Sequence, residues 1–404
     1  MYIRRAMEGR LEDLAEHFPV VLVCGARQVG KTTLLKELNK KRANTMNYVT
    51  LDYPNIRALA KSDPELFLQQ YESPLIIDEI QYAPELLSYI KIRVDNINEP
   101  GQYFLTGSQM FYMMKNVGET LAGRVGILSM YSMSRNEIEG RGNIPFLPEN
   151  KFSNSTDTIT KVFDSIYRGS MPKMISDTDL MPEDFYGAYM QTYIERDIRD
   201  LITIKDEIKF LNFMGCIAAR TSQEVNLTDI GKDVGIDKNT AESWLSILVT
   251  SGLVYLLRPF SGNTIKRIIK RPKLYFMDTG LACYLSLWNN PRALELSAMA
   301  GAMFETYVIS EIIKSYSNQG IDVRSRLFYY RDNNGKEVDL LILDNGTLYP
   351  VEVKKSAEPS KDAIKNFDVV SSLGHNVGKG AVICMTPMPI PLDKDNLLVP
   401  LGAI

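Results

Sequence analysis

A glycine-bounded loop near the N-terminus carries the clearest chemical signal in the sequence. Residues 25–32 read GARQVGKT and fit the pattern GxxxxGK(S/T), in which the loop backbone surrounds the β-phosphate of a nucleotide. Lys31 is expected to reach the β- and γ-phosphates, and the Thr32 hydroxyl to ligate Mg²⁺. We therefore predict an ATP site whose contacts are Gly25, Ala26, Arg27, Gln28, Val29, Gly30, Lys31, Thr32 and Thr33.

An acidic pair further along the chain supplies the other groups that nucleotide hydrolysis needs. Residues 75–79 read LIIDE, and the apolar part predicts a strand that ends at the two acids. Asp78 is expected to hold Mg²⁺ through water, and Glu79 to polarise the attacking water. Such a pair also occurs at the start of ordinary helices, but the loop upstream favours the catalytic interpretation.

Four segments in this order resemble the AAA-like ATPase domain of a large, poorly characterised family of bacterial and archaeal ATPases. They read GARQVGKTTLL, LIIDEIQ, YFLTGS and LAGRV, and the resemblance covers about residues 17–135. It implies that a polar residue at the tip of the strand predicted at residues 101–108 senses the γ-phosphate. Thr106, Ser108 and Gln109 all fit, and the sequence does not choose among them; Ser108 is included in the predicted site.

Arg124 lies in the LAGRV segment, between a predicted helix and a predicted strand. An arginine in this place can act as an arginine finger on the γ-phosphate, in the same chain or from a neighbouring subunit of a homo-oligomer. It can equally be a surface charge, and the sequence leaves both open. Arg27, inside the loop, is a second arginine that can contact a phosphate or a partner.

A second set of residues suited to chemistry lies in the last third of the chain. Glu352 and Lys354 alternate along the strand predicted from LYPVEVKKS, so both side chains leave on one face. Asp339, on the preceding strand, and Glu305, on the helix predicted at residues 301–317, are expected to meet them. Lys354 would orient water or steady phosphate charge. The predicted ligands of a metal ion here are the carboxylates of Glu305, Asp339 and Glu352.

The elements predicted around these residues follow the order αβββαβ. With Asp339 and the spacing Glu352-x-Lys354, this order resembles the restriction-endonuclease-like PD-(D/E)xK nuclease core over about residues 300–385. The resemblance implies magnesium-dependent cleavage of nucleic acid. The alternative is a buried ion network in a catalytically dead nuclease fold, and both stay open.

From residue 207 the pattern becomes helix, helix, turn, helix and hairpin. A short helix that starts near Asn226 and closes at Gly235, followed by a longer one, is the layout of a winged helix-turn-helix. The segment 258–273 is rich in Lys and Arg and has no acidic residue, which suits phosphate contacts on DNA or RNA. The longer helix also carries Glu242 and Trp244, and such modules dock proteins too, so both kinds of partner stay open.

Composition limits the remaining possibilities. A net charge of −3 means that any basic surface must be local. Four dispersed cysteines and two histidines disfavour a zinc ribbon, a disulfide scaffold, a histidine metal site and a serine–histidine triad. A carboxylate-bound Mg²⁺ is favoured instead. The N-terminus is charged, and no apolar run approaches a bilayer's thickness, so we expect a cytoplasmic protein without a membrane partner.

The expected fold is α/β, in four parts. They are a P-loop ATPase domain with a parallel sheet at residues 1–140, connector helices at 141–205, a winged helix at 206–275 and a restriction-endonuclease-like domain at 276–404. The expected function is Mg²⁺-dependent ATP hydrolysis that switches C-terminal domains engaging nucleic acid, with cleavage an open question. The alternative is an ATP-driven signalling or scaffolding switch with protein partners and a dead nuclease fold.

Overall fold

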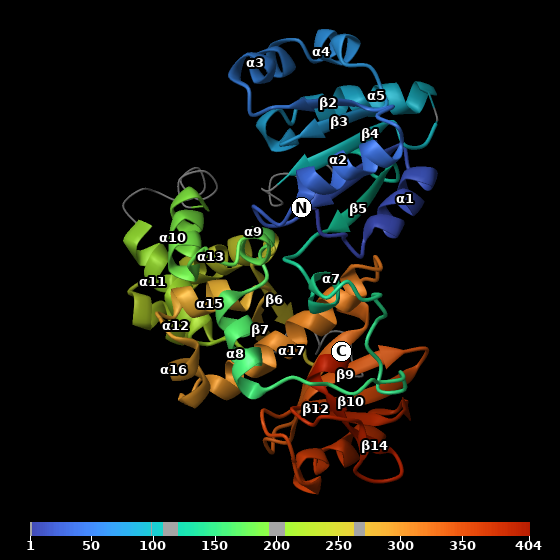
Figure 1. Cartoon of the computed structure of the whole chain (residues 1–404). Helices are drawn as coiled ribbons and strands as arrows, with labels where there is room; N and C mark the ends of the chain where they lie inside the picture. The colour runs from blue at the N-terminus through green and yellow to red at the C-terminus, as the bar shows by residue number, and fades with distance from the viewer. Residues whose placement is uncertain (1, 98, 108–119, 194–206, 262–270) are drawn as a thin grey trace.

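The computed structural model describes residues 2–97, 99–107, 120–193, 207–261 and 271–404. Three regions follow one another: a sheet covered by helices, a group of helices, and a second sheet (Figure 1). Several residues that the sequence singles out lie outside the described ranges, namely Ser108, Gln109, Lys266, Arg267 and Lys270.

The first sheet is parallel, as predicted, with strands in the order β2, β3, β4, β1, β5. All of β1 is buried, which explains its unbroken apolar sequence. Because the strands are parallel, their carboxyl ends share one edge, and β4 lies between β1 and β3. The strands are β1 Val20–Cys24, β2 Asn47–Thr50, β3 Leu75–Asp78, β4 Tyr103–Gly107 and β5 Val125–Ser129.

Helices cover both faces of this sheet (Figure 1). Val21 and Val23 of β1 pack with α1 and α2, whereas Val20 and Leu22 face the other core, with α3, α4 and α5. The alternation along β1 therefore feeds two separate hydrophobic cores. The helices are α1 Glu8–His17, α2 Lys31–Lys41, α3 Pro54–Ser62, α4 Pro64–Gln70 and α5 Leu86–Ile97.

The middle of the chain is mainly helical. The short helix α12 ends at Gly235, whose φ of +74° is the left-handed conformation that glycine favours, as its sequence predicts. After α13, strands β6 and β7 form an antiparallel pair. The elements are α7 Arg135–Ile138, α8 Ile159–Arg168, α9 Pro172–Ser176, α10 Pro182–Tyr193, α11 Glu207–Ala218, α12 Leu227–Val234, α13 Lys238–Thr250, β6 Val254–Leu257, β7 Lys273–Phe276, α15 Thr279–Leu285 and α16 Pro291–Leu296.

The C-terminal region begins with the long helix α17, Ala300–Ser317, which packs on a seven-stranded sheet. Strands β8, β9 and β10 are antiparallel neighbours, and β12 and β14 continue the sheet in parallel. The strands are β8 Leu327–Arg331, β9 Glu337–Asp344, β10 Thr347–Val353, β11 Asn376–Val377, β12 Gly380–Cys384, β13 Ile390–Pro391 and β14 Asn396–Pro400.

One predicted α-helix of this region is wrong. Where the sequence predicts a helix between β10 and β12, the chain forms two 3₁₀ helices, Lys361–Ile364 and Phe367–Leu373. Phe367, Val370 and Leu373 recur every third residue and pack on one small hydrophobic core. A spacing of three matches the three residues per turn of a 3₁₀ helix better than the period of an α-helix.

The three regions meet at a buried polar network. The ammonium of Lys314, on α17, donates to the Met133 carbonyl (3.0 Å), the Ser170 hydroxyl (3.2 Å) and the Glu311 carboxylate (2.9 Å). The Asp278 carboxylate accepts from the Ser170 backbone N–H (2.8 Å). Each buried polar group in this network thus has a partner, and the network ties α17 to both preceding regions.

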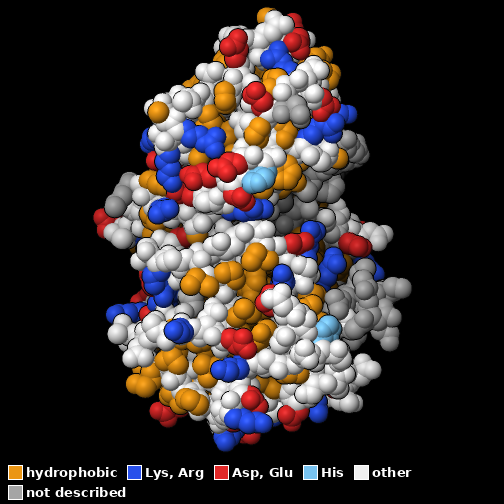
Figure 2. Space-filling model, turned by 90° about the vertical axis from the view of Figure 1, so that its right-hand side faces the viewer, with side chains coloured by type: hydrophobic (Ala, Val, Ile, Leu, Met, Phe, Trp, Pro, Cys, Tyr) orange, Lys and Arg blue, Asp and Glu red, His pale blue; other side chains and the backbone are white. Residues whose placement is uncertain are grey.

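Charges of both signs are mixed on the face of the molecule that Figure 2 shows. On the face in Figure 2, basic and acidic side chains are interspersed and apolar ones lie between them, in keeping with the small net charge. Among the described residues, no helix combines the length and the apolar character that a bilayer crossing requires.

Candidate functional site

The phosphate loop lies at the carboxyl edge of the first sheet, between β1 and α2. Gly25 has φ +146° and Gly30 has φ +100°, conformations that disfavour any side chain. A β-carbon on Gly25 would also clash with the Met130 carbonyl oxygen. Arg5 supports the loop, since its guanidinium donates to the Val29 carbonyl at 2.7 Å. The loop shape is therefore set by glycine geometry and by a buried arginine that the sequence analysis does not single out.

Lys31 is buried at the first turn of α2, and its ammonium lies over the loop. It donates to the carbonyls of Gly25 (2.9 Å) and Ala26 (2.8 Å). The positive charge is thus held where the phosphates of a nucleotide would approach the N-terminal end of the helix.

Asp78 joins the predicted metal ligands into one cluster. Its Oδ1 atom accepts a hydrogen bond of 2.7 Å from the Thr32 hydroxyl and another from the Thr106 hydroxyl. Its Oδ2 atom accepts from the Tyr48 hydroxyl at 3.1 Å. Of the three polar residues that fit the third strand tip, Thr106 is the one that the described structure brings to the site. The Ser108 and Gln109 predictions lie outside the described residues.

Glu79 lies beside this cluster with a left-handed backbone, φ +60°. Its N–H donates to the Thr106 hydroxyl at 3.1 Å, and its carboxylate accepts from the Gln81 amide. The unusual φ turns the chain sharply at the end of β3, and Glu79 lines the adjoining cavity. A carboxylate in this place can orient a water molecule against a bound phosphate.

The cavity above the loop measures about 640 Å³, and its walls come from two parts of the chain. The loop and α2 supply one wall, which includes Arg27 and Thr33. The α9 and α10 helices supply Pro172, Lys173 and Thr192. Sequence reasoning missed these last three residues, because nothing in the motif spacing indicates which distant segment closes the site.

Arg124 is not brought to the phosphate loop of its own chain. Its backbone carbonyl accepts from the Val20 N–H (3.2 Å), at the start of β1, whereas the loop follows the end of β1. Four strand residues separate the two edges, a distance of about 13 Å. Its guanidinium instead pairs with Asp95. A finger role within one chain does not fit this position, and a role towards a neighbouring subunit stays a prediction.

The predicted C-terminal residues do come together. Lys354 Nζ lies 2.6 Å from Glu352 Oε1, and Asp339 Oδ2 accepts from the Val353 N–H at 3.0 Å. Glu305, on α17, accepts from the Tyr275 hydroxyl at 2.7 Å. These groups lie where α17, β9 and β10 meet.

A residue that the sequence does not predict for this cluster lies among the carboxylates. The Lys273 ammonium is 3.2 Å from Glu305 Oε1 and 3.8 Å from Asp339 Oδ1, and it also pairs with Glu337. Lys273 belongs to the basic segment 258–273, which is predicted from the sequence to contact nucleic acid. Its position on β7, buried against α17, corrects that assignment, because a buried ammonium cannot touch a phosphate backbone.

Burial governs the ionisation of this cluster. Burial, together with the Asp339 carboxylate, raises the pKa of Glu305 to about 7 and that of Glu352 to about 8. Burial alone would lower the pKa of Lys273, but the carboxylates of Glu305, Asp339 and Glu337 outweigh it and raise this pKa. Within the described ranges, no three or more Asp, Glu, His or Cys side chains are arranged to hold a metal ion.

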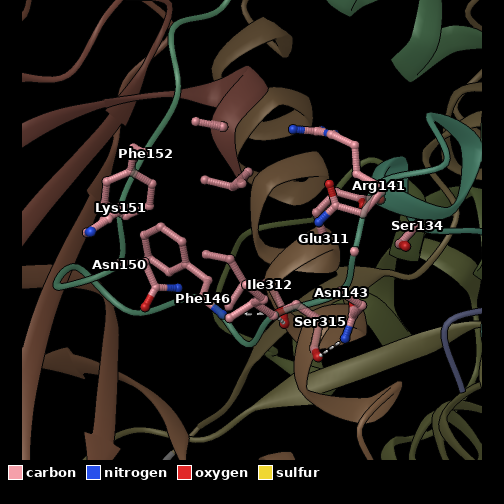
Figure 3. Close-up of a pocket in the computed structure, with 15 residues that line it drawn as sticks. Ser134, Arg141, Asn143, Phe146, Asn150, Lys151, Phe152, Glu311, Ile312 and Ser315 are labelled. Atoms are coloured by element: carbon pink, nitrogen blue, oxygen red, sulfur yellow. Dashed lines mark hydrogen bonds between the residues drawn. The ribbon is translucent and has the colours of Figure 1, made fainter. Parts of the chain in front are cut away.

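A second cavity, of about 290 Å³, lies between the segment 134–152 and α17 (Figure 3). The Asn143 amide donates to the Ser315 carbonyl at 2.9 Å. The Arg141 guanidinium donates to the Gly402 carbonyl at 2.7 Å and lies 2.8 Å from the Glu139 carboxylate. Its charge is thus compensated from within the chain, and we assign no chemistry to this cavity.

Comparison with known families divides the chain into three matches. Residues 17–139 match the family described as AAA domain. Residues 159–292 and 300–404 match two families described as domains of unknown function, DUF8612 and DUF4143. Together with the loop geometry, the first match supports an AAA-like P-loop ATPase fold for the N-terminal part of the chain.

Full-length relatives and solved structures add further similarities. Uncharacterized proteins of Mycobacterium tuberculosis and Mycobacterium bovis are each 27% identical over 361 residues, covering 88% of this chain and 75% of theirs. A Walker-type ATPase of Pyrococcus abyssi is 14% identical, with a TM-score of 0.46, over 70% of this chain and 96% of that one. The RuvB Holliday junction branch migration motor of Thermotoga maritima is 18% identical, with a TM-score of 0.30, over 62% and 88%.

Proposed function

We propose that this chain binds ATP with Mg²⁺ at the Gly25–Thr32 loop and hydrolyses it. The observation that carries the proposal is the hydrogen bond between Thr32 and Asp78 beside the cavity of about 640 Å³. A hydroxyl beside a carboxylate, next to a phosphate loop, is an oxygen-donor pair that suits Mg²⁺. Thr32 and Asp78 are the residues that would hold the ion, which neutralises phosphate charge when it is bound.

The remaining residues of the site have separate proposed roles. The loop N–H groups and Lys31 bind the β- and γ-phosphates, and Glu79 orients the water that attacks the γ-phosphorus. Thr106 fixes the Asp78 carboxylate and the Glu79 backbone at once, since its hydroxyl bonds to both. Lys173 lines the same cavity from α9, where it would meet the phosphates of a bound nucleotide.

Hydrolysis can act on the rest of the chain because the middle region packs directly on the loop. A β-carbon on Gly252, in the turn between α13 and β6, would lie 3.6 Å from the Ala26 nitrogen and 3.9 Å from Gly25 Cα. A change in the loop on ATP binding would therefore displace this turn. We infer that ATP turnover switches the position of α13 and the β6–β7 pair.

The switched element is proposed to be a winged helix-turn-helix that engages nucleic acid. Helices α11, α12 and α13 followed by the β6–β7 pair have that order. Lys238 and Asn239 are exposed at the start of α13, and Arg258 and Arg271 are exposed at the ends of the basic segment. Positive groups on these elements suit a phosphate backbone.

A second candidate function is an ATP-driven switch that binds a protein partner and carries an inactive nuclease-like domain. The specific observation in its favour is Lys273, which lies among the carboxylates of the cluster instead of on the surface. The negative charge of the exposed Glu242 on α13 would also repel a nucleic acid bound at this helix.

The two candidates are separated by ATP hydrolysis measured with and without double-stranded DNA or RNA at low salt, where electrostatic binding is strongest. A Lys31→Ala variant gives the background rate. Stimulation by nucleic acid supports the first candidate. Basal hydrolysis that is indifferent to both nucleic acids supports the protein-partner switch, and the absence of any rate above the Lys31→Ala background contradicts the ATPase proposal.

A further inference from the structure

We propose that Lys273 is the resident cation of the C-terminal carboxylate cluster and that it keeps divalent metal out of this site. The inference rests on the proposed nuclease-like character of this region, and it is independent of ATP hydrolysis. It explains why the residues of a metal-dependent nuclease motif are present and yet do not form a metal site among the described residues.

The position of the ammonium is the first argument. Lys273 Nζ contacts Glu305 and Glu337 and lies 3.8 Å from Asp339, so it stands between carboxylates of α17 and β9. Two of these groups, Glu305 and Asp339, are predicted ligands that would have to converge on a metal ion. A divalent cation placed among them would be within a few ångströms of a unit positive charge and strongly repelled in this buried setting.

The origin of the lysine is the second argument. The Glu352-x-Lys354 motif already supplies its own lysine, and Lys354 pairs with Glu352 at 2.6 Å. Lys273 comes from outside the motif, on β7 of the middle region, so the cluster is completed by a residue from another part of the chain. The motif alone therefore cannot report whether the cluster is free to bind metal.

The third argument is that Lys273 is held in place. Its side chain is 5% exposed, and the Tyr329 ring centroid lies 5.7 Å from its ammonium. Its strand is fixed by pairing with β6 and by a bridge to Glu224. Removing a buried cation from its carboxylate partners is costly, so a metal ion at ordinary concentration cannot displace it.

The test is a titration of the full chain with Mn²⁺ in the absence of nucleotide. Binding is measured by electron paramagnetic resonance and by calorimetry. All proteins in this titration carry Asp78→Asn, which removes the metal ligand of the ATPase site. The parent should show no Mn²⁺ binding at the cluster up to about 1 mM. Lys273→Met should gain one site with a Kd at least tenfold lower than that concentration, about 0.1 mM or below. Adding Glu352→Gln should abolish the gained site. Lys336→Met, an exposed lysine at the edge of β9, is the matched control and should behave as the parent.

The proposal is overturned by Mn²⁺ binding in the parent that Glu352→Gln removes, or by a folded Lys273→Met variant that gains no site. Because Lys273→Met leaves carboxylates without their cation, its folding is monitored by thermal unfolding. A variant that folds only when Mn²⁺ is added supports the proposal. The charge-matched pair Lys273→Met/Glu337→Gln removes one partner of Lys273 and leaves the three predicted ligands in place. It should fold in any case, and a folded pair without a gained Mn²⁺ site contradicts the proposal. With Asp78 intact, ATP hydrolysis by Lys273→Met should equal that of the wild type, which separates this result from the ATPase proposal.

Discussion

The Thr32 hydroxyl donates a 2.7 Å hydrogen bond to Oδ1 of Asp78, although their neighbouring strands, β1 and β3, are not adjacent in the sheet. Thr32 lies in the first turn of α2 after the phosphate loop, and Asp78 ends β3. Strand β4 lies between β1 and β3, and its Thr106 hydroxyl completes the contact. Three elements distant in the sequence thus place their oxygen atoms at one point of the sheet edge.

Asp78→Asn tests the metal role of this point. The amide keeps the size of the side chain and a hydrogen-bond acceptor for Thr32, but it lacks the negative charge that attracts Mg²⁺. We expect the turnover number for ATP to fall on the order of 100-fold, because a bound metal ion supplies several kcal/mol of charge stabilisation. Steady-state phosphate release measures it. Hydrolysis at the wild-type rate would contradict the assignment of Asp78.

Thr106→Ala tests the choice of the third-strand residue. The substitution removes a buried donor from Asp78 and the acceptor of the Glu79 N–H. An unpaired buried group costs about 1–3 kcal/mol, so we expect turnover about tenfold lower, with a smaller loss of stability. Thr106→Ser keeps the hydroxyl and should stay near the wild-type rate. Equal losses in both variants would show that packing of the methyl group, and not the hydroxyl, matters.

Local motifs explain what was predictable from the sequence. The phosphate loop, the strand before it and the acid pair each occupy one short segment, and the structure confirms the parallel sheet that positions them. The meeting of Glu305, Asp339 and Lys354 also follows from strand alternation and helix placement. By contrast, the 3₁₀ helices after β10 depend on the hydrophobic core against which Phe367 and Val370 pack. The periodicity of the sequence alone does not identify that core.

Contacts between distant segments cannot be predicted in the same way. The sequence predicts a surface position for Lys273, because the segment 258–273 contains five other basic residues and no acidic one. Only the fold shows that β7 passes beside α17 and turns this one side chain inward. Lys173 and Arg5 escape prediction for the same reason, since each reaches the ATP site from a segment with no motif of its own.

Lys173→Ala tests whether the middle region completes the ATP site. Lys173 lines the cavity from α9, and its ammonium forms an exposed ion pair with Asp177 at 2.8 Å. We expect the ammonium to leave this pair for a bound phosphate. Loss of a charged hydrogen bond to phosphate predicts about tenfold weaker binding. Titration with a fluorescent ATP analogue measures it, with Lys232→Ala, an exposed lysine of α12, as the matched control. Equal affinities in the two variants would place Lys173 outside the site.

Arg124→Ala distinguishes a surface ion pair from an arginine finger. The guanidinium pairs with Asp95 at the edge of the sheet opposite the loop, so we expect turnover within about twofold of the wild type. The counter-test mixes Arg124→Ala with Lys31→Ala. If Arg124 serves a neighbouring subunit, the first variant is inactive alone and regains activity in the mixture, because each supplies what the other lacks. An inactive Arg124→Ala variant, or activity restored by mixing the two variants, would contradict the expectation of a surface ion pair.

Lys314→Met tests the polar network that joins the three regions. The ammonium is 2% exposed and donates to Met133, Ser170 and Glu311, so its removal leaves the Glu311 carboxylate buried without a cation. We expect the free energy of unfolding to fall by about 3–5 kcal/mol, measured by urea denaturation. Lys314→Met/Glu311→Gln removes both charges and should recover part of the loss, although the new amide oxygen must still accept from the Arg135 N–H. A double variant less stable than Lys314→Met would show that the Arg135 contact, and not the ion pair, stabilises this junction.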